Sequence, residues 1–477
     1  MRKCRPRDLR GVFALSASVA IAAACGSADA CTHAGQSAAP ATRTVHADTV
    51  LVHNRAPERP DTARLREVFR IGQREGPPEY TFESINAFAV DRSGDIYIAE
   101  GRGPVRQYDA RGRFLALVAR RGGGPGEVGY VTGMVVDADG RLLVRDNLNG
   151  RVNVYGVDGR PTDHWPLPPG RPAYGRDAIV STALGLHIGI NPLLPESTGE
   201  LTFPRPAYAR LDSAGEPVDT LLIPMRFTEA CPALSEGWFR SGWSEDLRAP
   251  YIPKVRWALA PSGNLIVGCS VDYSFDIVQR DDTVLRISRD WIPVQASAEE
   301  RESFQDAMSI ERNASRFFQR WAWRGPALPD TRPAYQRFIV AEDGRIWVWP
   351  TQARHAESMP AALRQRGYPA RVWVDSRTGA FDVFEEDGRW LGTVALPPSV
   401  PYTADPGTVD PFMRGDTVWA VVVDSLDLEY LARFQVEWHP RAWRPSPRGA
   451  APAAHRTGRD RHRPAPGSPS GSRPVPR

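Results

Sequence analysis

A repeated β-hairpin pattern constrains the fold of this chain more than any other feature. Each copy has two short apolar runs joined by a turn with glycine, and DRSGDIYIAE (91–100) and DADGRLLVRD (137–146) are the clearest copies. Because glycine adopts positive φ without a steric penalty, Asp-Gly and Ser-Gly sequences are typical of tight hairpins. The turn glycines of all copies are Gly94, Gly140, Gly185, Gly263, Gly344 and Gly415. The first three recur roughly every 45 residues, which indicates an internal repeat.

A second hairpin follows five of the six first hairpins. These second hairpins lie at 107–118, 154–165, 209–223, 277–288 and 382–394. The last unit has only a third strand, EYLARFQVEW (429–438), whereas LREVFRIG (65–72) is strand-like and has no neighbour to pair with. An N-terminal strand can therefore complete the last unit. The pattern predicts an all-β fold, a six-bladed β-propeller of four-stranded blades closed by this N-terminal strand.

One unit carries a resemblance to a known family. The segment VVDADGRLLVRDNLNGRVNVYGVDGR (135–160) resembles an NHL-type repeat, with a strand that ends in Asp146-Asn147 and with Asn149 and Arg151 before the next strand. RRGGGPGEV (120–128) is similar to the interblade segment of bacterial six-bladed propeller lipoproteins. The resemblance is good over 69–165, fair over 257–288 and 338–394, and poor in the third and sixth units. It implies a fold rather than an activity, because this fold hosts many functions.

A short helical insertion interrupts the strand pattern. Ser297 and Glu300 have the spacing of a helix capping box, and apolar residues follow at helical spacing, so we expect a helix within about 297–323. The sequence then divides into a signal peptide (1–24), a flexible tether (25–62), the propeller (63–439) and a disordered Arg- and Pro-rich tail (440–477).

The N-terminus has the composition of an export signal. Basic residues precede the apolar run GVFALSASVAIAAA, which is too short to span a bilayer comfortably. The sequence Ala22-Ala23-Ala24-Cys25 resembles the lipobox of bacterial lipoproteins, although Ala22 stands where leucine is more common. This resemblance implies a lipid on Cys25 as the membrane anchor, at the outer membrane or the periplasmic face of the envelope. Simple secretion with cleavage near Ala30, and an apolar helix retained in the fold, are the alternatives.

Charge is unevenly distributed along the chain. Residues 1–24 carry a net charge of +4 and residues 440–477 carry +8, so the remainder carries −8 although the whole chain carries +4. An acidic body argues against nucleic acid as a partner, because phosphate binding needs clustered cations on one face.

Two cysteines of the predicted propeller are candidates for a disulfide. In an oxidising envelope, Cys231 and Cys269 can pair, and two buried free thiols are the alternative. No cysteine spacing indicates a metal site.

Binding residues are expected at the mouth of the propeller channel, on loops between the second and third strands of a blade and between blades. The candidates at these positions are Arg102, Arg145, Asp146, Asn147, Asp272, Trp349, His355 and Asp424. Arginines can bind a carboxylate or a sugar acid, because the guanidinium donates in a fixed fork. Asp146, Asp272 and Asp424 can bind Ca²⁺ if the fold brings their oxygens together. The alternative for each aspartate is a turn cap that accepts local backbone N–H groups.

Common catalytic signatures are absent from the sequence. We find no GxxxxGK[ST], HExxH, CxxC or GxSxG pattern, and therefore predict no catalytic residue and no resident cofactor. We expect a monomeric cell-envelope lipoprotein that acts as a non-catalytic scaffold for an envelope protein, a peptide or a glycan. The alternative is a hydrolase or lyase that resembles the propeller lactonases, with Ca²⁺ or Zn²⁺ in the channel. Apolar inner strands such as AFAVD (87–91) count against that alternative.

Overall fold

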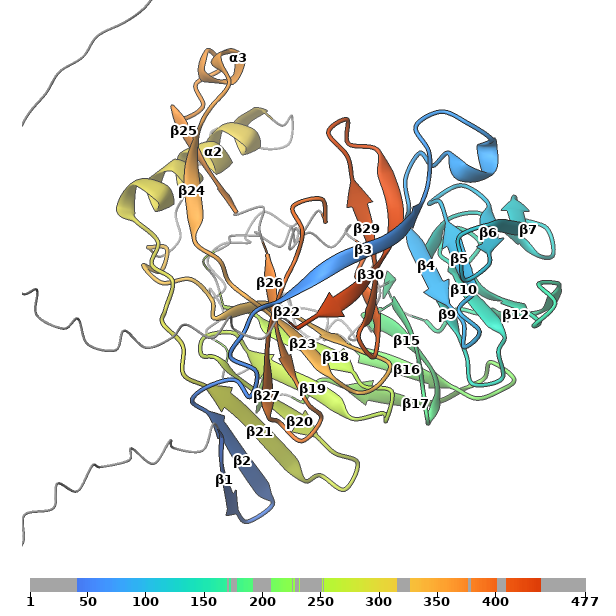
Figure 1. Cartoon of the computed structure of the whole chain (residues 1–477), viewed down its shortest axis with the longest axis horizontal. Helices are drawn as coiled ribbons and strands as arrows, with labels where there is room; N and C mark the ends of the chain where they lie inside the picture. The colour runs from blue at the N-terminus through green and yellow to red at the C-terminus, as the bar shows by residue number, and fades with distance from the viewer. Residues whose placement is uncertain are drawn as a thin grey trace, which may run out of the picture. The chain divides into compact units, whose positions relative to one another are not determined.

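β-Strands make up nearly all of the regular structure in the computed structural model of this protein (Figure 1). The structure describes residues 41–438, except for 170, 173–177, 192–206, 225, 228–230, 232–250, 252, 315–326, 376–378 and 401–408. The all-β prediction is therefore confirmed. The predicted signal peptide with Cys25 and the predicted tail over 440–477 lie outside the described residues.

Consecutive strands of the described residues pair antiparallel in runs of four, which we number units 1 to 6 in chain order. Unit 1 contains β4 (Ala87–Val90), β5 (Ile96–Ala99), β6 (Val105–Tyr108) and β7 (Phe114–Arg121), with β8 (Glu127–Val128) added in parallel to β7. Unit 2 contains β9 (Val131–Val136), β10 (Leu142–Asp146), β11 (Arg151–Tyr155) and β12 (Pro161–Pro166). Unit 3 contains β14 (Ile179–Thr182), β15 (Gly185–Asn191), β16 (Ala207–Leu211) and β17 (Pro217–Leu222), and β13 (Arg171–Pro172) also pairs with β15.

The later units follow the same order. Unit 4 contains β18 (Val255–Leu259), β19 (Leu265–Cys269), β20 (Ser274–Val278) and β21 (Val284–Arg289). Unit 5 contains β22 (Tyr335–Val340), β23 (Ile346–Pro350), β26 (Ala380–Phe384) and β27 (Trp390–Ala395). Unit 6 contains β28 (Phe412–Arg414), β29 (Thr417–Val423), β30 (Glu429–Glu437) and β3 (Ala63–Ile71).

Unit 6 takes its last strand from near the start of the chain. β3 pairs antiparallel with β30, from Arg64 opposite Glu437 to Ile71 opposite Leu431, which is the pairing predicted for 65–72. In Figure 1, β3 lies along β30 and leads toward β4 of unit 1. β3 also pairs in parallel with the end of β27, so units 5 and 6 belong to one continuous sheet.

The first hairpin of every unit turns through a glycine with positive φ, between 55° and 115°. At Gly185, where φ is 115°, an added Cβ would lie 2.9 Å from the carbonyl oxygen of Leu211. The backbone conformation and the available space therefore both require glycine at this turn. The hairpin turns predicted from the sequence repeat are confirmed at all six positions.

The hydrophobic core is divided among the contacts between neighbouring units. Ala99 of unit 1 belongs to the same buried cluster as Val144 of unit 2, and similar clusters join units 2 and 3, units 4 and 5, and units 5 and 6. Ile98 of unit 1 clusters with Trp419 and Leu431 of unit 6. The last unit thus packs against the first, as well as against the unit before it.

Residues 41–54 correct the tether predicted over 25–62. They form a hairpin of β1 (Ala41–His46) and β2 (Thr49–Asn54), and β2 pairs in parallel with β21. The reason is the alternation in TVLVHN, which buries Val52 in the cluster between units 4 and 5. Beyond the hairpin, backbone N–H groups of Glu58 and Arg59 donate to carbonyl oxygens of β27 at 2.9 and 2.7 Å. We call residues 41–62 the N-terminal strap, because they follow the outer edges of units 4 and 5.

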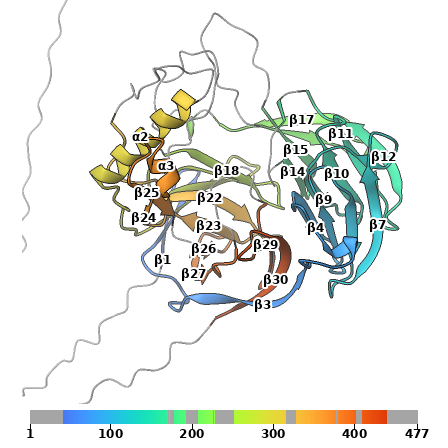
Figure 2. The same cartoon turned by 90° about the horizontal axis from the view of Figure 1, so that it is seen from above.

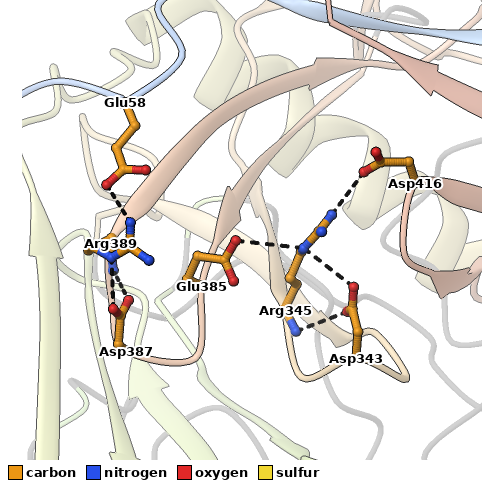
Figure 3. A network of polar contacts seen from close by, with 7 residues as sticks. All are labelled: Glu58, Asp343, Arg345, Glu385, Asp387, Arg389 and Asp416. Carbon is orange, nitrogen blue, oxygen red and sulfur yellow. Dashed lines mark hydrogen bonds and ion pairs between the residues drawn. The ribbon is translucent and has the colours of Figure 1, made fainter.

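Ion pairs connect the strap and the hairpin turns of units 5 and 6 (Figure 3). Arg389 pairs with Glu58 of the strap at 2.6 Å and with Asp387 at 2.7 Å. Arg345 pairs with Asp416 of unit 6 at 3.0 Å and also contacts Asp343 and Glu385. Burial alone would lower the pKa of Arg345, but the ion pairs outweigh it and raise the pKa above its ordinary value.

Among the described residues, two helix-containing insertions lie outside the four-strand pattern. Helix α2 (Ala298–Ala314) begins after Ser297, whose Oγ accepts the N–H of Glu300 at 3.1 Å, so the predicted cap is confirmed. The rest of the predicted insertion, from residue 315, lies outside the described residues. A hairpin of β24 (Arg354–Ser358) and β25 (Arg371–Asp375), with α3 (Ala361–Arg364) at its tip, lies beside α2, as both views show (Figures 1 and 2). A 3-10 turn, η1 (Pro78–Tyr80), precedes β4. None of the described helices has the length and apolar character that a membrane span requires.

Cys231 and Cys269 form a disulfide, with their Cα atoms 5.3 Å apart. Of the two alternatives that the sequence left open, the paired form is therefore the one present. The bond connects the chain after β17 to the end of β19, and so ties units 3 and 4 together.

Candidate functional site

A cavity of about 420 Å³ lies where the first strands of the units face one another. Its lining comes from all six units, through β4, β9, β14, β18, β22 and β28 and the turns that follow several of them. Figure 2 shows β4, β9 and β14 facing β18 and β22 across the middle of the described fold. The cavity is thus built by the repeat itself and not by any single insertion.

The walls of the cavity are mostly apolar. Typical lining residues are Phe88, Met134, Ile179 and Phe338, each on a different first strand. Several polar residues stand where first strands lead into their hairpin turns, and they are Asp91, Arg92, Asp137, Ser181, Thr182, Glu342 and Arg414. The polar groups therefore gather toward one end of the cavity, which we call its turn end.

The aspartates of the turn end are occupied by local hydrogen bonds. Asp91 Oδ1 accepts the Ser93 hydroxyl at 2.7 Å and the Asp95 N–H at 2.8 Å. Asp137 Oδ1 accepts two turn N–H groups, and its Oδ2 accepts Nε of Arg141 at 2.8 Å. These carboxylates cap their turns, which is the role expected for aspartate at this position.

Arg414 joins three units at the turn end. Its Nη1 donates to the carbonyl oxygen of Asp91 at 2.6 Å, and its Nη2 donates to that of Val90 at 3.3 Å. Its Nε pairs with Glu342 of unit 5. Deeper along the cavity, Asp410 pairs with Arg337 of β22. The charges of these four side chains are therefore compensated by one another or by backbone groups.

Arg92 and Ser181 differ from the other polar lining residues. Neither side chain makes a hydrogen bond or an ion pair with any part of the chain that the structure describes. Arg92 is exposed and follows Asp91 in the first turn of unit 1. Two side-chain hydrogen-bond donors at the turn end, Arg92 and Ser181, therefore have no partner among the described residues.

Three of the predicted site residues form one buried network at the end of β10. Arg145 is 1% exposed and donates to Asn147 at 3.0 Å and to the carbonyl oxygens of Ala178 and Gly189 in unit 3. Asp146 is completely buried and accepts the N–H groups of Gly129 and Tyr130 at 2.8 and 2.9 Å. Arg145 thus connects units 2 and 3, and Asp146 holds the loop before β9.

The same network explains the motif that resembles an NHL repeat. Asn149 donates to Asp146 at 2.7 Å and to the carbonyl oxygen of Gly122 at 2.9 Å. Arg151 donates to the carbonyl oxygens of Gly124 and Glu127. The motif residues therefore fix the Gly-rich segment between units 1 and 2.

The other predicted site residues are dispersed. Asp424 accepts the N–H groups of Leu426 and Leu428 and the hydroxyl of Tyr430, and these hydrogen bonds, the Leu426 N–H first, hold its pKa below the ordinary value. His355 is exposed on β24 and contacts Glu357 at 3.0 Å. Trp349 is 6% exposed at the end of β23. Arg102 and Asp272 are exposed in loops.

The structure does not bring Asp146, Asp272 and Asp424 together as a calcium site. Among the residues that the structure describes, no three His, Cys, Asp or Glu side chains are placed to hold a metal ion. Asp146 and Asp424 are instead bonded to backbone N–H groups, which was the alternative for both. None of the eight predicted residues lines the cavity, because they lie at the other ends of the second strands or in later loops.

Sequence reasoning missed the turn-end residues Arg92, Ser181, Glu342 and Arg414. A usable signal was present, since they stand in or beside the first-hairpin turns that defined the repeat. What the sequence did not show is that these turns, rather than the loops after the second strands, border the cavity.

Comparisons with known proteins give structural likeness only. No family model matches the chain, and no curated protein matches it. A DUF4221-family member from Bacteroides vulgatus is 9% identical, with 79% of this chain and 99% of that chain covered and a TM-score of 0.45. An exported protein from Bacteroides fragilis, described as putative, is 9% identical, with 81% and 99% covered and a TM-score of 0.43. A PQQ-bound aldose sugar dehydrogenase from Streptomyces coelicolor is 13% identical, with 80% and 100% covered and a TM-score of 0.37. At these identities and TM-scores, the likenesses assign this chain to no family and to no activity.

Proposed function

We propose that this protein is an exported six-bladed β-propeller that binds a small, largely apolar molecule in its central cavity without transforming it. The observation that carries the proposal is the cavity that the first strands of all six units line together. Its volume of about 420 Å³ lies within the range of small-molecule sites, and apolar walls with a few polar groups are typical of such sites.

The propeller assignment rests on three features of the described chain. The units repeat the same four-strand order, β3 completes the last unit, and unit 6 packs against unit 1 through a buried cluster. A closed arrangement of six blades accounts for all three, because it leaves no large apolar sheet face uncovered. It also places every first strand at the central channel.

Export and a lipid anchor complete the proposal. The N-terminal sequence supports a signal peptide with Cys25 as the lipidated residue, and the Cys231–Cys269 disulfide suits an oxidising compartment. We propose that the protein is held by this lipid at the outer membrane or the periplasmic face, as a monomer. The cavity favours a small molecule over the larger peptide, glycan or protein partners that the sequence alone left unranked.

Blocking the cavity tests this function. Ala138 is exposed in the turn after β9 and lines the cavity, so Ala138→Trp should obstruct it with little cost to folding. The probe is the neutral fluorophore N-phenyl-1-naphthylamine, titrated into the mature full-length protein. We expect the unmodified protein to bind one probe molecule per chain. The variant should bind the probe at least about tenfold more weakly, because the tryptophan keeps one aromatic ring of the probe from being buried in the cavity.

The matched control is Ala214→Trp, in an exposed turn of unit 3 that does not line the cavity. This variant should bind the probe as the unmodified protein does. Equal binding by all three proteins, or no binding by the unmodified protein, would overturn the proposed function.

A further inference from the structure

We infer that the cavity selects an amphipathic carboxylate, with the carboxylate bound by Arg92 and the apolar part in the channel. The inference rests on the proposed function and adds the chemical class of the ligand.

The acidic groups of the lining already have hydrogen-bond or ion-pair partners within the protein. Asp91 and Asp137 accept hydrogen bonds from their own turns, Glu342 pairs with Arg414, and Asp410 pairs with Arg337. None of these carboxylates is left without a partner. The side chains left without a partner among the described residues are the guanidinium of Arg92 and the hydroxyl of Ser181. Both can donate hydrogen bonds, so the ligand group that fits them is an acceptor.

Among the first-hairpin turns, that of unit 1 carries a positively charged residue at this position. The residues that follow the first strands at equivalent turn positions are Arg92, Ala138, Ala183, Pro261 and Glu342. Arg92 and Glu342 are the charged members of this set, and Glu342 is neutralised by Arg414. Arg92 is therefore the uncompensated charge among these equivalent positions.

The turn that carries Arg92 is fixed by hydrogen bonds within itself and by one from the neighbouring unit. Within the turn, the Gly94 N–H donates to the Asp91 carbonyl oxygen at 3.2 Å, and the Asp91 carboxylate accepts from Ser93 and Asp95. From the neighbouring unit, Arg414 donates to the Asp91 carbonyl oxygen. The backbone that carries Arg92 is thus fixed at the cavity, and only its side chain must become ordered when a ligand binds.

A carboxylate is the acceptor that best suits an isolated guanidinium. The planar fork of arginine donates two parallel hydrogen bonds to a carboxylate, which is stronger and more directional than a bond to a neutral acceptor. Away from the turn end the lining residues are mainly apolar, which disfavours a highly hydroxylated molecule, because each buried hydroxyl would need a hydrogen-bond partner. An aliphatic or aromatic monocarboxylate satisfies both conditions.

The test compares three probes that share an eight-carbon chain: octanoate, octan-1-ol and octylammonium. Each displaces N-phenyl-1-naphthylamine from the mature full-length protein near neutral pH. We expect octanoate to act at roughly tenfold lower concentration than octan-1-ol, and octylammonium to be the weakest. Arg92→Gln should remove the advantage of octanoate while leaving displacement by octan-1-ol unchanged, and Arg92→Lys should retain part of it.

The control is Arg111→Gln, at an exposed turn of the second hairpin of unit 1, outside the cavity. It should behave as the unmodified protein does. If octan-1-ol and octanoate act equally, or if Arg92→Gln changes nothing, the carboxylate inference is wrong while the cavity remains a binding site. Failure of the fluorophore to bind, or its indifference to Ala138→Trp, instead overturns the proposed function on which the inference rests.

Discussion

Asp146 stands where a ligand-binding carboxylate is expected, but both of its oxygens accept hydrogen bonds from the protein itself. Its two oxygens accept the N–H groups of Gly129 and Tyr130 and the side-chain amide of Asn149, and it is completely buried. A metal bound there would have to displace these donors. The sequence offered a backbone cap as one of two roles for Asp146 but not its partners, because Gly129 and Tyr130 belong to the loop before β9 and meet it only in the folded unit.

Replacing Asp146 should therefore lower the stability of the protein rather than abolish metal binding. Asp146→Ala leaves the buried N–H groups of Gly129 and Tyr130 without an acceptor, so the free energy of unfolding should fall by about 3 kcal/mol. Urea-induced unfolding measures the change. Asp272→Ala, at an exposed residue without a hydrogen bond or ion pair to the part of the chain that the structure describes, should change it by less than about 0.5 kcal/mol. Equal stability of the two variants would refute the structural role of Asp146.

At the scale of elements, the sequence predicted the strands of the repeat and missed the strap. Repeated strands were recognisable because each copy supports the others, and their glycine turns mark the boundaries. The hairpin of β1 and β2 has no second copy, and β2 pairs with β21, which is far away in the sequence. Neither its existence nor its parallel pairing follows from local pattern, so the sequence alone predicts a flexible tether at this short strand.

Asn54 at the end of β2 should contribute most to holding the strap in place. It is 1% exposed; its Nδ2 donates to the carbonyl oxygens of Ser288 and Gly388 at 3.2 and 3.0 Å, and its Oδ1 accepts the Trp390 N–H at 2.9 Å. Asn54→Ala leaves these backbone groups of units 4 and 5 unpaired, and should lower the free energy of unfolding by about 2–4 kcal/mol.

Hydrogen exchange provides a second readout of the strap. In Asn54→Ala, the amides of β2 and β27 should exchange faster than in the unmodified protein, since the strap then opens locally. Thr44→Ala, at an exposed position of β1, is the matched control and should leave exchange and stability unchanged. Protection of β2 that is the same in Asn54→Ala and in the control would show that Asn54 does not fasten the strap.

For the whole molecule, the repeat was sufficient to predict how the last unit is completed, but not what the centre of the fold contains. Pairing of β3 with β30 follows from a missing strand at one end and a spare strand at the other. The cavity depends instead on the side chains that first strands from six units place opposite one another, and on which turns face it. Such convergence of residues far apart in the sequence is invisible to a search by motif or spacing.

The contact between the last and first units should limit the stability of the whole molecule, and Arg414 is the residue through which it can be weakened selectively. Arg414→Gln removes the donors to the carbonyl oxygens of Asp91 and Val90 and the ion pair with Glu342. Because its side chain is 29% exposed, solvent offsets part of the loss, and we expect a decrease of about 1–2 kcal/mol in the free energy of unfolding.

Amides of β4 and β28 should lose protection from hydrogen exchange before those of β10 and β19, which lie in units away from this contact. The control Arg113→Gln removes the exposed ion pair with Asp109 within unit 1. It should change neither the free energy of unfolding nor the protection of β4 and β28 from hydrogen exchange. A uniform loss of protection over all units would mean that the closure is held by β3 and the buried cluster, without a separate contribution from Arg414.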